Sequence, residues 1–194
     1  MTRTKVLELQ SQEAELRVPE QRNQALTDNL ASLPNREAYE ETAAKEVQRW
    51  QHYCRPLCVD VCDIDLFKSV NDHYGHSAGD EGLRQLASLL ETRLRGTDFI
   101  ARYGGEEFVM LLPETDRDQA ALLMNNLREA IESNPIIWKK KTLNLTVSVG
   151  IANFKVKDIL QSAFARADRV LYQAKANGRN QVQLAMDYDA LRST

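Results

Sequence analysis

Residues 98–113 read DFIARYGGEEFVMLLP, and this stretch decides the fold. Two short apolar runs flank Gly104 and Gly105, and a Gly-Gly pair permits the positive φ angles of a tight turn between antiparallel strands. The stretch is therefore predicted to be a β-hairpin. A hairpin in the middle of a chain that otherwise alternates helices and strands excludes a purely parallel, doubly wound sheet.

The segments on both sides of the hairpin alternate between strand-like and helical patterns. A buried strand is expected at PLCVDVCDID (56–65), followed by a turn-rich connection at 67–83. Residues 143–154 alternate like a strand with one polar face. Further helices are predicted at residues 35–51, 83–94, 116–132 and 158–178, and a last short strand at 181–185. This order indicates an α+β fold of the split βαβ type, with a mixed, mostly antiparallel sheet flanked by helices.

Length and composition place the chain among ordinary globular proteins. Its 194 residues fit one domain plus an appendage, and 43% apolar residues are enough for a proper core. A formal charge of −3 gives no general attraction to nucleic acid or to anionic membranes. No apolar run approaches the roughly 20 residues that span a bilayer, and the start lacks the apolar core of a signal peptide. We expect no nucleic-acid partner, no membrane span within this chain, and a cytoplasmic location.

Three segments are expected along the chain: a helical linker or truncated stalk at 1–27, a globular domain at 28–185 and a tail at 186–194. Leu9, Leu16 and Leu30 fit a seven-residue repeat, but Asn23 and Pro19 interrupt it. A solvated tail left by cutting a longer protein fits the first segment equally well. The chain is interpreted as the output module of a longer regulator, attached to a membrane or free of it.

The three cysteines, Cys54, Cys58 and Cys62, are four residues apart, a spacing that could suggest metal ligands. Only His52 lies near them in sequence, and Cys62 falls inside the predicted strand. Reduced thiols, at least one of them in the core, are the better interpretation.

Carboxylates gather at the ends of two predicted strands. Asp63 and Asp65 close the first strand, and Glu106 and Glu107 lie on the hairpin bend. If the hairpin pairs beside the first strand, Asp63 comes close to the glutamates, and their repulsion would favour a bound cation. Three carboxylates suit a hard cation such as Mg²⁺, and two metals about 3.5–4 Å apart serve in-line phosphoryl transfer. Acids at a soluble loop tip are the alternative for the glutamates alone.

The connection at 67–83 carries groups that a guanine nucleotide needs. Lys68 can neutralise developing negative charge on a phosphate. A carboxylate such as Asp80 can accept the two adjacent donors of guanine, and Asn71 can donate to or accept from neighbouring atoms. Considered alone, Asn71 could simply be a turn-forming residue, and Asp80 could be the N-cap of a helix.

The chain resembles the GGDEF family of diguanylate cyclases over residues 28–183. Five ordered blocks carry the resemblance: DNLASLPNR (28–36), DIDLFKSVNDHYGHSAGD (63–80), GGEEF (104–108), SVGIA (148–152) and ADRVLYQAKANGRN (167–180). The bend is the GGEEF variant of the signature. The first block departs from the family pattern at Ala31 and Ser32, which bears on the local turn and on signal coupling, and not on the chemistry.

The resemblance implies a palm-like fold related to nucleotidyl cyclases and polymerases. It also implies condensation of two GTP molecules to cyclic di-GMP by a homodimer with one GTP in each half-site. Two Mg²⁺ ions, or Mn²⁺ as an alternative, would be held by Asp63, the carbonyl of Ile64, Glu106 and Glu107. Glu106 would also be the base for the ribose 3′-hydroxyl, and Lys68 would stabilise the transition state.

The resemblance also assigns substrate-binding positions. Asn71, His76 and Asp80 match them, although His76 could equally be a loop-packing residue. Lys175 and Arg179, four residues apart on one face of a helix, match positions that reach the terminal phosphates. Without the resemblance they would pass for a solvated helix end.

Arg95 and Asp98, in the stretch RGTD, match the RxxD inhibitory site of the family. Arginine can grip a phosphate or a guanine edge with two hydrogen bonds, and aspartate can accept from guanine. Cyclic di-GMP is therefore expected as an allosteric inhibitor as well as the product.

Two rival functions remain open. One is a catalytically silent module that binds GTP or cyclic di-GMP, against which the intact set of carboxylates argues. The other is a different palm enzyme, such as a mononucleotide cyclase or a polymerase fragment. The RxxD pair and the lack of a basic channel for nucleic acid argue against it.

Overall fold

The structure is a computed structural model in which residues 24–186 are described. The predicted stalk and tail therefore lie almost entirely outside the described residues. Within 24–186, no helix is both long and apolar enough to cross a membrane.

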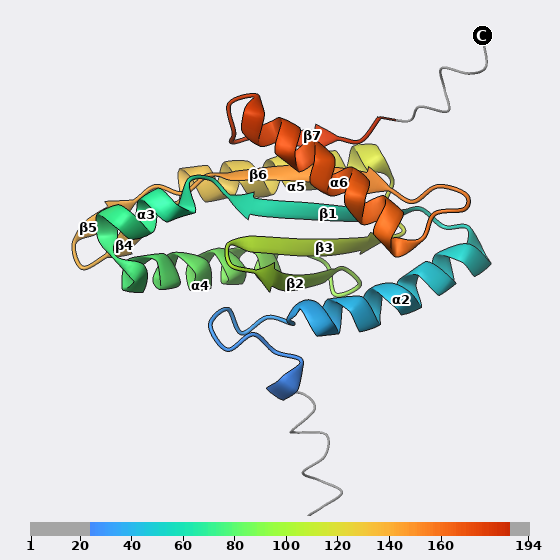
Figure 1. Cartoon of the computed structure of the whole chain (residues 1–194), viewed down its shortest axis with the longest axis horizontal. Coiled ribbons are helices and arrows are strands. Elements are labelled where there is room, and N and C mark those ends of the chain that lie inside the picture. The colour runs from blue at the N-terminus through green and yellow to red at the C-terminus, as the bar shows by residue number, and fades with distance from the viewer. Residues whose placement is uncertain (1–23, 187–194) are drawn as a thin grey trace, which may run out of the picture.

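A five-stranded sheet with the strand order β2-β3-β1-β6-β7 forms the centre of the domain (Figure 1). Its neighbours pair antiparallel except β6 and β7, which are parallel. The prediction of a mixed, mostly antiparallel sheet is therefore confirmed. The strands are β1 (Leu57–Ile64), β2 (Phe99–Gly104), β3 (Glu107–Pro113), β6 (Val147–Asn153) and β7 (Val182–Leu184).

Helices cover both faces of this sheet. In Figure 1, α6 crosses in front of β6 and α5 runs behind it. One apolar cluster joins α2 and α6 to the sheet, and a second joins α4 and α5 to the opposite face. The helices are α2 (Arg36–Tyr53), α3 (Phe67–Tyr74), α4 (His76–Arg93), α5 (Arg117–Ser133) and α6 (Leu160–Ala176).

The hairpin and the short last strand are confirmed as β2–β3 and β7. Two helix ends follow from local capping chemistry. Asp116 opens α5, because its side chain accepts from the backbone N–H of Gln119 at 2.9 Å. Gly178, with φ of 112°, follows the end of α6, where a left-handed residue ends a helix readily.

The prediction of a turn-rich connection at 67–83 was wrong. That stretch contains α3 and the start of α4, and the two helices are separated only at Gly75, whose φ is 88°. Gly79 and Gly82 lie inside α4 and are buried. A Cβ on Gly79 would collide with Asn71 of α3, so this glycine serves close packing rather than a turn.

The strand predicted at residues 143–154 is confirmed as β6 (Val147–Asn153), but its expected start and its expected polar face were wrong. Leu143 ends β5 (Lys141–Leu143), which pairs with β4 (Ile136–Trp138) in a small separate sheet that the sequence did not predict. The strand β6 begins only at Val147, and its first six residues are buried. Its polar residues are covered because α5 and α6 enclose both faces of the strand.

Candidate active site

The backbone brings the predicted carboxylates to one corner of the sheet. Asp63, at the end of β1, lies directly opposite Glu107, at the start of β3. The N–H of Ile64 donates to the carbonyl oxygen of Glu106 at 3.3 Å. Gly105, with φ of 46°, makes the turn that puts both glutamates beside β1. The structure therefore places Asp63, Glu106 and Glu107 next to one another.

Asp63 is held in an ion pair by the last helix. Its Oδ2 lies 2.8 Å from Nζ of Lys175, and its side chain is 8% exposed. Burial raises the pKa of Asp63 to about 6; the Lys175 ammonium opposes this rise, and the charges of Glu106 and Glu107 add to it. The acids are thus close enough to repel one another, and Lys175 supplies the compensating charge.

The donor set of this corner suits a hard cation by chemistry and by strand position. However, within the described residues no group of three or more His, Cys, Asp or Glu side chains converges as a metal site. To hold an ion, the carboxylates would have to turn toward one another, and Asp63 would have to share or release Lys175. The corner therefore fits the predicted ion in its composition without forming a closed set of ligands.

Asp65 has a structural role that the sequence did not predict. Its carboxylate accepts from Oγ1 of Thr146 at 2.8 Å, from Oγ of Ser148 at 2.7 Å and from the backbone N–H of Asn180 at 2.9 Å. These bonds fix the chain just after α6, where Arg179 lies exposed. The alternation of Thr146 and Ser148 on a predicted strand was the signal that could have indicated such an acceptor.

The predicted guanine-binding residues lie together where α3 packs on α4. Asn71, on α3, places its Oδ1 against Gly79 of α4, next to Asp80. This oxygen is buried and has no hydrogen-bond partner among the described residues. Asp80 is the fifth residue of α4, so it is not the N-cap of that helix. His76 begins α4 and is exposed, and so is Lys68 on α3.

Arg102 stabilises the glycine bend and links it to the domain-entry turn. Its guanidinium donates to the carbonyl oxygen of Gly105 at 3.0 and 2.7 Å, and to both carboxylate oxygens of Asp28 at 2.9 and 3.1 Å. Asp28 in turn accepts from the N–H groups of Leu30 and Ala31. The domain-entry turn is thus formed with Ala31 in place, and it is tied directly to the bend.

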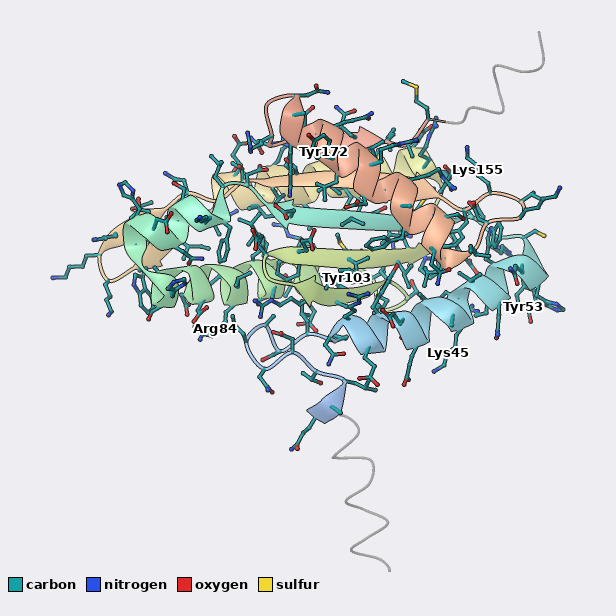
Figure 2. The ribbon with its side chains drawn as sticks, in the orientation of Figure 1. Lys45, Tyr53, Arg84, Tyr103, Lys155 and Tyr172 are labelled. Carbon is teal, nitrogen blue, oxygen red and sulfur yellow. The ribbon has the colours of Figure 1, made fainter. Side chains whose placement is uncertain are left out.

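Tyr103 holds the other side of the bend against the helices (Figure 2). Its ring centroid lies 5.0 Å from that of Phe164 on α6 and 5.8 Å from that of Tyr39 on α2. The guanidinium of Arg36 lies over the same ring, 4.7 Å from its centroid. These contacts fix the hairpin between α2 and α6, which the sequence alone did not indicate.

Arg95 and Asp98 lie in one turn before β2, at the end of the hairpin remote from the glycine bend. The N–H of Arg95 donates to Oδ2 of Asp98 at 2.8 Å, and the N–H of Asp98 donates back to the carbonyl of Arg95 at 3.0 Å. Oδ1 of Asp98 is buried without a hydrogen-bond partner in the described part of the chain. The Arg95 side chain is exposed, so it is the accessible member of the pair.

Comparison with known proteins assigns this arrangement to a family. The model of the family described as "Diguanylate cyclase, GGDEF domain" matches residues 25–181. The chain therefore belongs to the GGDEF family, and the palm-like α+β fold that the resemblance implied is confirmed.

Particular relatives are similar over most of this chain. It is 42% identical to diguanylate cyclase DgcP of Pseudomonas aeruginosa over 185 residues, covering 95% of this chain and 28% of DgcP. It is 37% identical to the response regulator PleD of Caulobacter vibrioides over 161 residues, covering 81% of this chain and 36% of PleD. The chain thus spans about a third of the length of these relatives.

Solved structures agree with this assignment. The coiled coil and GGDEF domain of DgcB from Caulobacter crescentus, in complex with c-di-GMP, aligns with a TM-score of 0.87 at 30% identity and covers 94% of this chain and 98% of that one. The active GGEEF domain of a diguanylate cyclase from Vibrio cholerae aligns with a TM-score of 0.72 at 30% identity, covering 79% of this chain and 97% of that one.

Proposed function

We propose that this chain is a diguanylate cyclase domain that condenses two GTP molecules to cyclic di-GMP and releases two pyrophosphates. The observation that carries the proposal is the pairing of Asp63 opposite Glu107, with Glu106 adjacent and Lys175 on the Asp63 carboxylate. Several acids and one movable cation at a single corner suit the phosphates and metal ions of a nucleoside triphosphate.

Asp63, the carbonyl of Ile64, Glu106 and Glu107 would hold Mg²⁺, two ions per site, or Mn²⁺ in its place. Bound ions would neutralise the phosphate charge and stabilise the developing oxyanions. Glu106, on the bend braced by Arg102, would accept the proton of the attacking ribose 3′-hydroxyl. A base must lie within hydrogen-bond reach of the proton that it accepts. The hydrogen bond from Arg102 to the carbonyl of Gly105 would therefore help to position Glu106.

The remaining residues would bind substrate from the two sides of this corner. Asn71 and Asp80 would read the guanine edge, and His76 would line the same region. Lys68 would stabilise the transition state. On the opposite side, Lys175 and Arg179 would bind the terminal phosphates, with Lys175 leaving Asp63 for a phosphate oxygen when metal arrives.

Pairing of two domains follows from the chemistry. The 3′-hydroxyl of one GTP must reach the α-phosphate of the other, and two domains facing each other across a two-fold axis solve this with one surface. Residues 28–185 would form the catalytic half, and residues 1–27 would belong to a linker that brings two copies together. The structure of DgcB, in which a coiled coil accompanies the GGDEF domain, supports that organisation. We place the domain in the cytoplasm, where GTP is available.

Arg95 and Asp98 would bind cyclic di-GMP as an inhibitor, away from the reacting corner. Their position at the remote end of the hairpin supports a separate site. The exposed Arg95 would make the first contact, and Asp98 would have to exchange its bond to the Arg95 backbone for a guanine donor.

One observation favours a second candidate, a silent nucleotide-binding module. The Lys175–Asp63 pair occupies a predicted metal ligand, and the carboxylates in the described region do not converge. Product analysis across a range of protein concentrations, with GTP and Mg²⁺, separates the two functions. A cyclase gives cyclic di-GMP at a rate per molecule that rises with concentration. Intact GTP binding without product at high concentration would establish the silent module, and cyclic GMP would indicate a different palm enzyme.

A further inference from the structure

A fully buried carboxyl group lies in the middle of the central strand. Asp60 has an exposed fraction of 0%, and neither of its oxygens has a hydrogen-bond partner among residues 24–186. A buried polar group without a partner is rare because it loses its hydration and gains nothing in return. The proposed cyclase reaction does not use Asp60, so the group needs a separate explanation.

Asp60 points to the face of the sheet that α4 and α5 cover. Its cross-strand neighbours on β3 and β6 are Met110 and Ile151, and both belong to the apolar cluster of that face. Cys58 and Cys62, two residues before and after Asp60 on the same side of β1, belong to the same cluster. The helices α4 and α5 contribute Leu83, Leu86, Leu90, Met124 and Leu127 to this cluster.

The electrostatic surroundings favour the neutral acid. Burial raises the pKa of Asp60 well above its ordinary value of 3.8, and the negative charge of Asp98 raises it further. The titratable groups beside it on β1 are the thiols of Cys58 and Cys62, and burial raises the pKa of both. A buried acid without a counter-ion keeps its proton as long as the site stays dry.

We propose that Asp60 is a proton-dependent latch on the α4–α5 face of the sheet: the face stays closed while the acid keeps its proton and opens when the acid loses it. The inference is independent of the proposed cyclase activity. It concerns the helices that carry Asp80 and the strand that ends in Asp63, so opening would also loosen the candidate site.

The sign of the linkage follows from proton counting. At a pH above 3.8, the open state releases the Asp60 proton while the closed state retains it. Stability therefore falls as the pH rises, until the pH passes the pKa of the buried acid. For one proton, the equilibrium constant for opening rises about tenfold per pH unit in that window.

The cysteines provide a direct measurement of opening. Cys58 and Cys62 are buried beside Asp60, whereas Cys54 is exposed, and all three are free thiols. Alkylation of the full chain with iodoacetamide, followed by mass spectrometry of each cysteine, gives the rate at each position. Dividing the rates at Cys58 and Cys62 by the rate at Cys54 removes the ordinary pH dependence of thiol reactivity. We expect this ratio to rise about tenfold per pH unit in the wild type between about pH 7 and 8, above the pKa of about 6 of Asp63.

Two variants test whether Asp60 is responsible. Asp60→Asn keeps the shape without a titrating group, and Asp60→Val removes the polar atoms in favour of a strand-forming residue. Both should lose the pH dependence of the ratio, and Asp60→Val should label at least tenfold more slowly than wild type at pH 8. Asp168→Asn, at an exposed position of α6, is the matched control and should keep the wild-type slope. An unchanged slope in either Asp60 variant would overturn the latch, and Asp60→Val keeps the test decisive if Asp60→Asn does not fold.

Discussion

Lys175 places its Nζ 2.8 Å from Oδ2 of Asp63, so the last helix neutralises the acid that ends the central strand. This ion pair joins two residues to which the sequence assigned separate roles: Lys175 as a phosphate-binding cation and Asp63 as a metal-binding carboxylate. Loading the proposed site would exchange this ion pair for two others, Asp63 with metal and Lys175 with phosphate. Asp63 and Lys175 would each keep a partner of opposite charge in both states.

The first prediction concerns this exchange. Lys175→Met removes the ammonium and keeps most of the apolar stem. A charge-assisted hydrogen bond contributes roughly 1.5–3 kcal/mol, so we expect the KM for GTP to rise at least about tenfold. Direct titration of metal with Mn²⁺ should show affinity equal to or tighter than wild type, because Asp63 loses its competing partner. Weaker Mn²⁺ binding in this variant would contradict the exchange.

Glu106→Gln should lower turnover at least about 100-fold, the scale for removing a positioned base. The bend itself depends on Arg102 and Gly105 and not on this carboxylate, so circular dichroism and thermal unfolding should stay close to wild type. Cyclic di-GMP formation under saturating GTP is the measurement. Activity near the wild-type level would remove Glu106 from its proposed role.

Gly79→Ala should weaken GTP binding without unfolding the domain. The added Cβ would meet Oδ1 of Asn71 and push that side chain away from Asp80. Loss of one hydrogen bond to guanine amounts to about 1 kcal/mol, so the KM for GTP should rise roughly five- to tenfold. Gly82→Ala is the control on the same helix, because its Cβ would meet Leu145 at 3.3 Å and leave Asn71 alone. Equal effects of the two substitutions would mean that α4 packing, and not Asn71, is responsible.

Arg95→Ala should weaken inhibition by cyclic di-GMP while the initial rate persists. Arg95 is exposed and lies at the end of the hairpin away from the acids, so the reacting corner is not disturbed. Progress curves with added product give the inhibition constant, which should rise at least about tenfold for loss of a bidentate arginine. A lowered initial rate with unchanged inhibition would place Arg95 elsewhere in the mechanism.

The brace between Asp28 and Arg102 should contribute to acid stability. Burial raises the pKa of Asp28, but the hydrogen bonds from the Ala31 backbone and from Arg102 outweigh it and leave the pKa below 3.8. The contribution is therefore present above pH 3.8 and is lost as the pH falls through the lower, folded-state value.

In urea unfolding at pH 7, Asp28→Asn should lower the free energy of unfolding by about 1–3 kcal/mol relative to wild type. This difference should shrink toward pH 2. Glu40→Gln is the control, since Glu40 pairs with Arg36 on the exposed surface of α2. It should change stability by less than about 0.5 kcal/mol at either pH. A pH-independent difference for Asp28→Asn would show that its carboxylate charge is not what matters.

Local chemistry was readable from the sequence. A Gly-Gly turn between two apolar runs predicts a hairpin because φ at Gly105 must be positive. The pattern of residues 116–132 predicts a helix, and the structure adds that the Asp116 side chain caps its first turn by accepting from the N–H of Gln119. The neighbouring positions of Asp63 and the two glutamates followed from one further step, the pairing of the hairpin with the first strand.

Glycine gave a misleading signal where packing outweighed turn chemistry. Gly79 and Gly82 belong to the stretch that was predicted as a turn-rich connection, yet both lie inside α4. A Cβ at Gly79 would collide with Asn71 of α3, and one at Gly82 would press on Leu145. Composition alone cannot separate these two uses of glycine. The polar residues of β6 gave a similarly misleading signal. They suggested a solvent-exposed face, but α5 and α6, which precede and follow β6 in the chain, enclose the strand.

The sequence by itself determined the family, the hairpin, the alternating elements and the set of chemical groups, because these depend on neighbours within a few residues or on short ordered motifs. Only the tertiary structure decided which polar groups meet: Lys175 with Asp63, the backbone N–H of Asn180 with Asp65, and Arg102 with Asp28. It alone also showed that Asp60 is buried without a hydrogen-bond partner in the described part of the chain. Such relationships arise where α6 and the entry turn close over the ends of the sheet, so they depend on packing between segments far apart in the chain.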